Sequence, residues 1–283
     1  MRKSRSWRAL LCGLCLAFSV SVHSQRATFK HFTQTPTGDW QTTIIHNDGS
    51  RHVYTYVSQT KFTPHVDVSI RVLEARRGLI SYEYKVENDP KSLQPIGSFF
   101  IGAGDQRRID FDHVRAPDGW QILMNSFYSL VSRVPPGARV EFGGEARALP
   151  GVMNLDLFSD IGTVLELPED LDEEQANELS TINSLSVAAR GLAPKIPIGD
   201  TLDPARALSA VLMHYGQEFQ DEGHPATYRL GQIDMAAPLT RADLLGRLAA
   251  LKQVADIPGE NDWHRSLSQG LDACVQILRA NVR

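Results

Sequence analysis

Residues 26 to about 157 alternate between apolar and polar side chains with a period of two, which is typical of β-strands that bury one face. In "SYEYKVENDP" (81–90) the apolar Tyr82, Tyr84 and Val86 fall on one side and charged residues on the other. We expect such apolar faces to form a core, because burying each large side chain contributes about 1.5–3 kcal/mol. Strands are predicted around residues 40–44, 53–57, 66–72, 82–86, 99–101, 109–111, 122–124, 128–131, 139–142 and 153–157.

Turn signals separate these strands. Asn47-Asp48-Gly49 in "HNDGS" predicts a tight hairpin turn. Arg76-Arg77-Gly78 predicts a three-residue hairpin loop in which Gly78 takes the left-handed conformation. That loop gives an expected register, in which Val72 faces Tyr82, Ile70 faces Tyr84, Val68 faces Val86 and Arg71 lies opposite Glu83. Many short antiparallel strands of this kind favour a sandwich of two sheets.

Beyond Pro168 the apolar residues recur with helical spacing. The segment 169–191 predicts a helix that ends at Gly191, and "PKIPIGD" (194–200) a linker. Further helices are predicted from Asp203-Pro204, from the capping box at Thr240, and from about Asp262. We expect the last two to form an antiparallel helical hairpin. The apolar stripe of the first helix would comprise Leu171, Leu179, Ile182, Leu185 and Ala189.

The two periodicities together predict an α+β protein. An N-terminal antiparallel β-sandwich would occupy residues 25–160 and an α-helical region residues 161–283. Residues 1–24 are set apart as a secretory signal peptide, because a basic start is followed by the uncharged apolar run "ALLCGLCLAFSVSV" (9–22). Cleavage is expected near Ser24/Gln25, which places the mature chain in the periplasm or outside the cell. The alternative is a retained membrane anchor, although this run is shorter than the ~20 residues that cross a bilayer.

Removal of the signal peptide changes the charge and the cysteine content. The mature chain would keep 25 Lys and Arg against 33 Asp and Glu, a net charge of −8. Such an acidic protein is a poor candidate for binding nucleic acid or an anionic membrane. Of the three cysteines only Cys274 remains, so the fold would have no intrachain disulfide.

Four short motifs carry a resemblance to a known group. "YEYKVEN", "IGSFFI", "APDGW" and "VPPGARVEFGG" resemble segments of uncharacterised secreted bacterial proteins that combine an immunoglobulin-like β-sandwich with a helical C-terminal tail. The helical tail of those proteins resembles the segment "LLGRLAALKQVADIPGENDWHRSLSQGLDACVQIL" of this chain. The chain departs from that pattern where Leu130 or Val131 stands in place of a second strand tryptophan. The resemblance implies a fold and an exported location, and it implies no catalytic residues and no cofactor.

One candidate metal site lies in "HYGQEFQDEGH". His214 and Glu218 are four residues apart on a predicted helix, so both face the same side, and His224 follows shortly after. Zinc accepts such a set of ligands. The zinc-protease order HExxH is absent, however, and the solvated face of an amphipathic helix accounts for the same residues.

The second candidate lies in "IDFDHVRAPDGW", where Asp110, Asp112 and Asp118 are possible calcium ligands. A calcium-binding EF-hand requires an oxygen ligand and then a glycine where Val114 and Arg115 stand. Alternating aspartates on the outer face of a strand are the simpler interpretation.

The remaining motifs are weaker candidates for a functional site. "GAGDQR" at Gly102 lacks the third glycine of a dinucleotide-binding loop, and Cys274 lies on an apolar helical stripe that is typical of an inert thiol. The tryptophans would stack on a sugar or pack in the core. They are Trp40, Trp120 and Trp263.

Three functions follow from these patterns. The first is an exported, non-catalytic binding or structural protein that presents loops or a sheet face to an extracellular or envelope protein or glycan. The second is a secreted hydrolase, with metal dependence as one option, whose site would be assembled from Asp110, Asp112, His113 and the His214 group. The third is an envelope assembly or scaffold protein that pairs through sheet edges and the helical hairpin.

Overall fold

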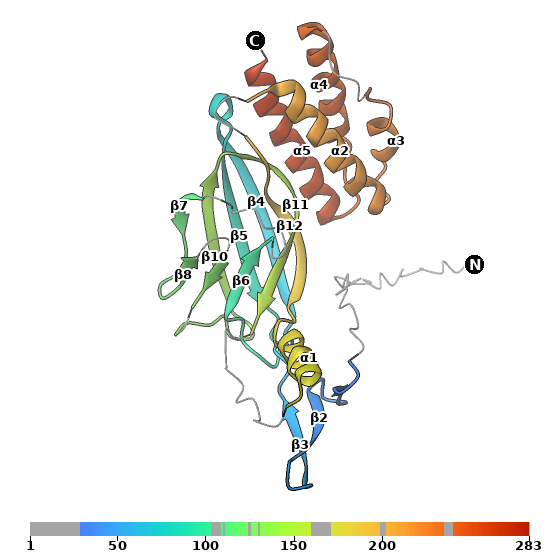
Figure 1. The fold of residues 1–283 in the computed structure, drawn as a ribbon. Coiled ribbons are helices and arrows are strands. Elements are labelled where there is room, and N and C mark those ends of the chain that lie inside the picture. Colours follow the sequence, from blue (N-terminus) through green and yellow to red (C-terminus); the bar gives the residue numbers. More distant parts are fainter. Residues whose placement is uncertain are drawn as a thin grey trace, which may run out of the picture.

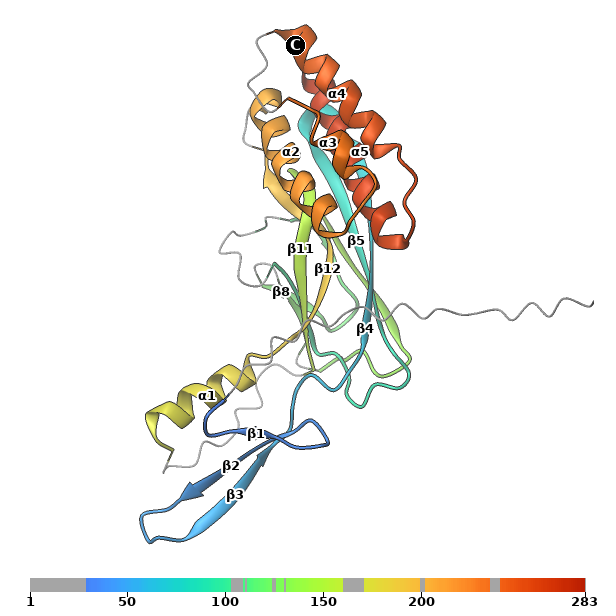
Figure 2. The ribbon, with the colours of Figure 1, turned by 90° about the vertical axis from the view of Figure 1, so that its right-hand side faces the viewer.

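A computed structural model describes residues 29–102, 109, 111–123, 126–129, 131–159, 171–198, 202–234 and 240–282. It confirms a mixed protein of antiparallel sheets, with helices mainly in the C-terminal half (Figure 1). In Figures 1 and 2 the helices α2, α4 and α5 lie at one end of the sheets, and α1 with a small β-hairpin lies at the other. Within the described part of the chain, we find no helix with the length and apolar character needed to cross a membrane.

A small sheet forms the end that carries α1 (Glu173–Asn183). Its strands are β1 (Thr33–Gln34), β2 (Trp40–Ile45) and β3 (Arg51–Tyr56), in that order. The Asn-Asp-Gly turn is confirmed, and Gly49 has the positive φ of 83° that the turn requires. Four buried side chains hold this sheet against α1: Phe32, Tyr56, Leu179 and Ile182. We call β1, β2, β3 and α1 the hairpin lobe.

A second sheet has the strand order β4-β5-β10-β7. These strands are β4 (Pro64–Glu74), β5 (Leu79–Asn88), β7 (Asp112–Arg115) and β10 (Arg139–Ala146). The 3₁₀ turn η1 (Ala75–Arg77) and Gly78, at φ 64°, connect β4 to β5, as the sequence predicts.

The expected register of this hairpin is wrong by two residues. Ile70 faces Tyr82 and Val68 faces Tyr84, because β4 runs on to Glu74 and a register shift lies between Val72 and Glu74. The expected pair of Arg71 with Glu83 is therefore absent, and Arg71 lies opposite Ser81. A two-residue shift leaves every side chain on its expected face, so Tyr82, Tyr84 and Val86 remain buried as predicted.

The third sheet has the order β12-β11-β6-β9-β8. These strands are β6 (Ser98–Ile101), β8 (Gln121–Leu123), β9 (Ser126–Tyr128), β11 (Ala148–Phe158) and β12 (Val187–Pro197). Aromatic side chains join it to the second sheet, with ring centroids of Tyr84 and Phe99 5.4 Å apart and those of Phe99 and Phe142 5.6 Å apart. One continuous hydrophobic core lies between the two sheets.

The strand β12 corrects the predicted helix at 169–191. The helix α1 ends at Asn183, and β12 then pairs with β11 from Val187 to Pro197. Leu185 and Ala189 are therefore not on a helix, and "PKIP" is strand rather than linker. Pairing with β11 satisfies the backbone of a segment whose apolar spacing also suits a helix, so tertiary contact overrides local propensity. The division into domains at residue 160 stays a prediction.

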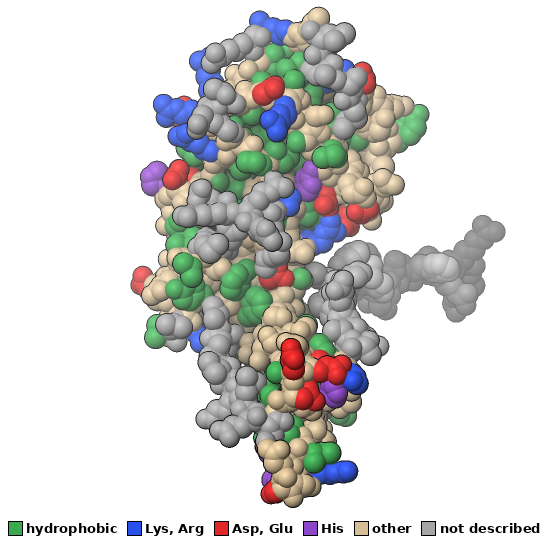
Figure 3. All heavy atoms as spheres, viewed as in Figure 1, with side chains coloured by type: hydrophobic (Ala, Val, Ile, Leu, Met, Phe, Trp, Pro, Cys, Tyr) green, Lys and Arg blue, Asp and Glu red, His purple; other side chains and the backbone are tan. Residues whose placement is uncertain are grey.

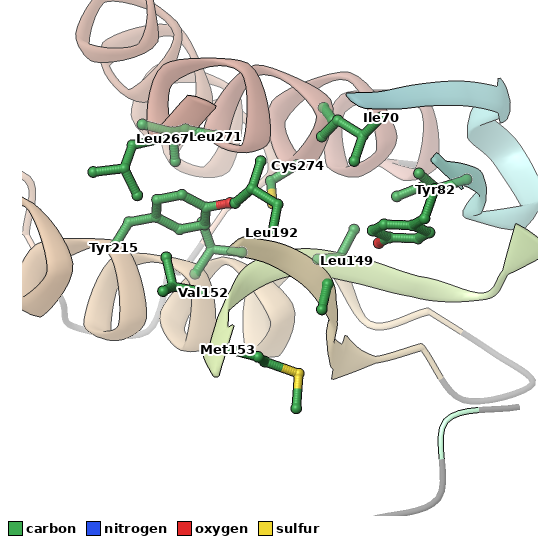
Figure 4. Close-up of a cluster of buried hydrophobic side chains, with 14 of the residues drawn as sticks. Ile70, Tyr82, Leu149, Val152, Met153, Leu192, Tyr215, Leu267, Leu271 and Cys274 are labelled. Atoms are coloured by element: carbon green, nitrogen blue, oxygen red, sulfur yellow. The ribbon is translucent and has the colours of Figure 1, made fainter. Parts of the chain in front are cut away.

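The predicted C-terminal helices are confirmed. They are α2 (Pro204–Asp221), α4 (Arg241–Ala255) and α5 (Asp262–Asn281). The short α3 (Thr227–Leu230) lies in a stretch where the sequence predicts no helix. Asp203 caps α2, and Thr240 forms a capping box with Asp243. The apolar faces of α2 and α5 continue the sheet core. Figure 4 shows this junction, where Tyr215, Leu271 and Cys274 of the helices meet Leu192 and Val152 of the strands.

Candidate functional site

His214 fastens α2 to the third sheet. Its Nε2 accepts a 2.8 Å hydrogen bond from the backbone N–H of Val152 on β11. Burial lowers the pKa of His214 from 6.5 to about 4, and the nearby charges of Lys195 and Arg190 act in the same direction. The neutral ring then carries its proton on Nδ1, so neither nitrogen offers a free lone pair to a metal ion.

Glu218 is engaged by an arginine from β12. Arg190 pairs with the carboxylates of Glu218 and Glu222, and its guanidinium lies 5.4 Å from the ring centroid of Trp263. Burial raises the pKa of Glu218, and the charge of Arg190 opposes that rise. This group therefore ties β12 to α2 and α5.

His224 is buried beyond the end of α2. Its Nδ1 accepts a 2.9 Å hydrogen bond from the backbone N–H of Ala226, and its ring packs against Phe219 and His264. Burial, and then the neighbouring His264, lower its pKa from 6.5 to about 4. His224 is neutral at pH 7 and, like His214, uses its free lone pair on the backbone.

The three predicted ligands of this region are not brought together. Among the described residues, His214, Glu218 and His224 do not form a set whose ligand atoms lie within metal-binding reach of one another. Each instead has a structural partner of its own. A metal at this place was only a candidate beside the preferred interpretation of a solvated helix face, and it stays a candidate.

The predicted calcium ligands lie on and beside an edge strand. Asp112 begins β7, opposite Glu145 of β10, and Asp118 is exposed in the turn before Gly119. Asp110 lies outside the described residues. Between them His113 has a positive φ of 46°, and its Nδ1 lies 3.0 Å from the Glu145 carboxylate, which raises the pKa of His113. The side chains of Asp112 and His113 are exposed on β7 of the second sheet, whereas His214 contacts β11 of the third sheet.

The other sequence candidates have packing roles. Cys274 is fully buried and donates to the Pro150 carbonyl at 3.6 Å, and burial raises its thiol pKa. Trp120 packs edge-on against Phe142, and Trp40 against Phe29. Gly102 ends β6 with a positive φ of 69°, and most of the "GAGDQR" motif lies outside the described residues.

A groove of about 620 Å³ lies between β12 and the start of α2. Its lining is mostly apolar, with Lys195, Asp203, Arg206 and His214 as the polar members. Asp203 is occupied in capping α2 through the N–H groups of Ala205 and Arg206. The groove is open, and the acid and the imidazole among its described lining residues, Asp203 and His214, are each engaged by backbone N–H groups.

The hairpin lobe carries an exposed face that the sequence does not single out. Ile45 and Val53 are 60% and 65% exposed and belong to the outer face of β2 and β3. We call this the hairpin face. It consists of Gln41, Thr43, Ile45, Arg51, Val53 and Thr55. Both Figures 1 and 2 show β2 and β3 projecting beyond the rest of the molecule.

A cluster of potential metal ligands lies on the same lobe. His31, Glu174 and Glu178 each offer one ligand atom, and these atoms lie within 4.8 Å of one another. No other set of three is found among the described residues. Figure 3 shows acidic side chains gathered on the surface around α1. The spacing of the two glutamates is the only sequence signal, because His31 and Glu178 are 147 residues apart.

Comparisons with known proteins give no relative. No family model, no curated protein and no solved structure matches this chain. Inferences about function therefore depend on the geometry of the described residues.

Proposed function

We propose that the protein is exported and acts as a non-catalytic binding protein, and that the hairpin of β2 and β3 pairs, along the outer edge of β3, with a strand of an extracellular or envelope partner protein. The observation that carries this proposal is the hairpin face together with the outer edge of β3. Among the described residues, β3 is the last strand of its sheet and has no neighbour on its outer side.

A protein strand is the partner that suits such an edge. Unpaired N–H and C=O groups along a strand form hydrogen bonds with an added strand, and side-chain pockets supply specificity. Exposed edges are usually protected by proline, charged side chains or a bulge. In "RHVYTY" (51–56) Arg51 is the one Lys or Arg and stands at the first position, and the segment has no proline and pairs with β2 without a register shift. Exposed Ile45 and Val53 then add apolar area to the contact.

The remaining sheets suit a supporting role. We propose that they form an immunoglobulin-like sandwich, which the aromatic contacts between the second and third sheets support. The binding interpretation is favoured over the hydrolase because His214, Glu218 and His224 are each engaged in contacts that hold elements together.

Site-specific photocrosslinking in the native host tests this function. A photoreactive residue in place of Val53 is expected to give one discrete adduct in material whose N-terminus is Gln25. Ile45→Lys should abolish that adduct, because it places a charge on the hairpin face. The controls are the photoreactive residue at Tyr228, which is 76% exposed on α3, and Val131→Lys, at a side chain that is 84% exposed in the wild type.

Equal adducts from positions 53 and 228, or an adduct that survives Ile45→Lys, would contradict the proposal. Adducts only with a second copy of this chain would favour the assembly function instead.

A further inference from the structure

We propose that His31, Glu174 and Glu178 form a Zn²⁺ site that fastens the N-terminal segment of the lobe to α1. This inference is independent of the strand-pairing proposal, because the three side chains lie on α1 and before β1 rather than on the hairpin face.

The glutamates are held in place by different contacts. Glu178 accepts hydrogen bonds from two consecutive backbone N–H groups, at 2.8 Å from Lys30 and 2.9 Å from His31, with one carboxylate oxygen each. Glu174 lies one helical turn earlier, so both carboxylates face the same segment. Its Oε2 pairs with the Lys30 ammonium at 2.8 Å.

His31 supplies an unused nitrogen to this cluster. Its Nδ1 is shielded from solvent and has no hydrogen-bond partner among the described residues. The nearest carboxylate oxygen, Glu178 Oε1, is 3.6 Å away, which is too far for a good hydrogen bond. Two ligand atoms that each lie about 2.0–2.2 Å from one tetrahedral zinc ion are separated from each other by a distance close to that between His31 Nδ1 and Glu178 Oε1. The spacing therefore suits an ion between these atoms better than a direct contact.

The donor set suits zinc chemically. One imidazole nitrogen and two carboxylate oxygens are ligands that Zn²⁺ uses, and a water can complete four-coordination. Two backbone N–H groups donate to Glu178, and hydrogen bonds of this kind favour the ionised carboxylate that a metal ligand must be.

Lys30 is the competitor that the proposal must account for. Its ammonium neutralises Glu174 when no metal is bound, and the pair raises the pKa of Lys30. The Lys30 side chain is 68% exposed, so it can turn into solvent when zinc takes its place. The two roles of Glu174 therefore predict different effects of removing Lys30. A purely ionic cluster would only lose the Lys30–Glu174 pair, whereas a metal site would bind zinc more tightly.

The position gives the ion a structural purpose. The lobe has only four buried hydrophobic side chains in its own cluster, and the described chain has no disulfide. A metal would cross-link segments that are 147 residues apart in sequence. Such a link restricts the unfolded chain and stabilises a small core that is otherwise marginal.

Isothermal titration of chelator-treated protein with Zn²⁺ tests the site. The wild type is expected to bind one equivalent and to melt at a higher temperature when zinc is present. Glu174→Gln should weaken binding by at least about tenfold. Among the described residues no backbone N–H donates to the Glu174 carboxylate, and this side chain is 57% exposed, so the variant should fold. Glu173→Gln is the matched control, because it removes the same charge from the same turn of α1 without touching a ligand.

Lys30→Ala separates the two interpretations. It should strengthen zinc binding, because the ion no longer competes with an ammonium for Glu174. The proposal is overturned if the wild type binds no zinc, if Glu174→Gln binds it as well as the wild type, or if Lys30→Ala weakens binding. None of these results would affect the adducts expected at Val53.

Discussion

At the scale of single residues, the half-buried His214 and the buried His224 act as hydrogen-bond acceptors. His214 accepts from the N–H of Val152 and His224 from that of Ala226. Each bond requires an unprotonated nitrogen, and burial lowers both pKa values from 6.5 to about 4. Protonation would turn an acceptor into a donor that faces another N–H group. These two contacts are therefore sensitive to pH, although they lie outside any reaction.

We expect acidification to weaken the protein through these histidines. Between pH 6.5 and 4 the unfolded chain binds protons on both rings and the folded protein does not, so stability falls as pH falls. The raised pKa of Asp156 and of Glu218 acts with the opposite sign, because those folded carboxyls hold protons to a higher pH than the unfolded ones do. Thermal melting at pH 7, 6, 5 and 4 measures the sum of both effects.

A variant isolates the contribution of one ring. His214→Gln keeps an oxygen that can accept from the N–H of Val152 and does not titrate in this range. Its melting temperature should therefore fall less between pH 7 and pH 4 than that of the wild type. Equal decreases in the two proteins would show that His214 is not protonated on unfolding in that window.

At the scale of secondary-structure elements, local pattern predicted the helices with strong caps and the hairpins with strong turns. Asp203 with Pro204 and the Asn-Asp-Gly turn lie where the sequence places them. The segment that became β12 was predicted as helix and linker, because its pairing with β11 depends on a strand some 40 residues earlier rather than on its own composition. The register of β4 with β5 was missed for a related reason, since the shift near Glu74 is invisible in the alternation.

The candidate sites likewise divide into those that local sequence pattern predicts and those that only the folded structure brings together. Half of the hairpin face follows from alternation, because Gln41, Thr43 and Ile45 lie on the side of β2 opposite its predicted core face. The half on β3 does not, because Val53 and Thr55 belong to the alternating side that was expected in the core, and both are exposed. The group of His31 with Glu174 and Glu178 does not follow from local pattern either, because docking of α1 brings those residues together. Conversely, His214 and Glu218 share a helix face as expected, but their partners on β11 and β12 decide what they do.

Arg190 tests whether β12 is fixed to the helices by charge. Arg190→Ala would leave the partly buried carboxylate of Glu218 without its counter-charge, at a cost of about 1–3 kcal/mol in the free energy of unfolding. Chemical denaturation at pH 7 measures this loss. Adding Glu218→Gln to Arg190→Ala should restore part of it, because the amide needs no counter-charge. A double variant as unstable as Arg190→Ala alone would assign the loss to the contacts of Arg190 with Glu222 and Trp263 instead.

At the scale of the whole molecule, the described residues form two separate hydrophobic clusters. The larger one runs from the second and third sheets into α2, α4 and α5 (Figure 4). The smaller one belongs to the hairpin lobe alone. Stability should therefore be unequal, because a region with few buried apolar contacts opens at a lower free energy than the main core.

Native-state hydrogen exchange of chelator-treated protein should show this difference. We expect amides of β2 and β3 to exchange by local opening, at a free energy several kcal/mol below that of β5 and with little dependence on denaturant. Ile182→Ala removes part of the lobe cluster and should lower the protection of β2 and β3 by about 2 kcal/mol or more. Leu271→Ala, in the main core, is the matched variant and should lower the protection of β5. If Ile182→Ala lowered β5 and β2 equally, the lobe and the main core would unfold as one unit, and a partner strand or a zinc ion at the lobe would then stabilise the entire protein.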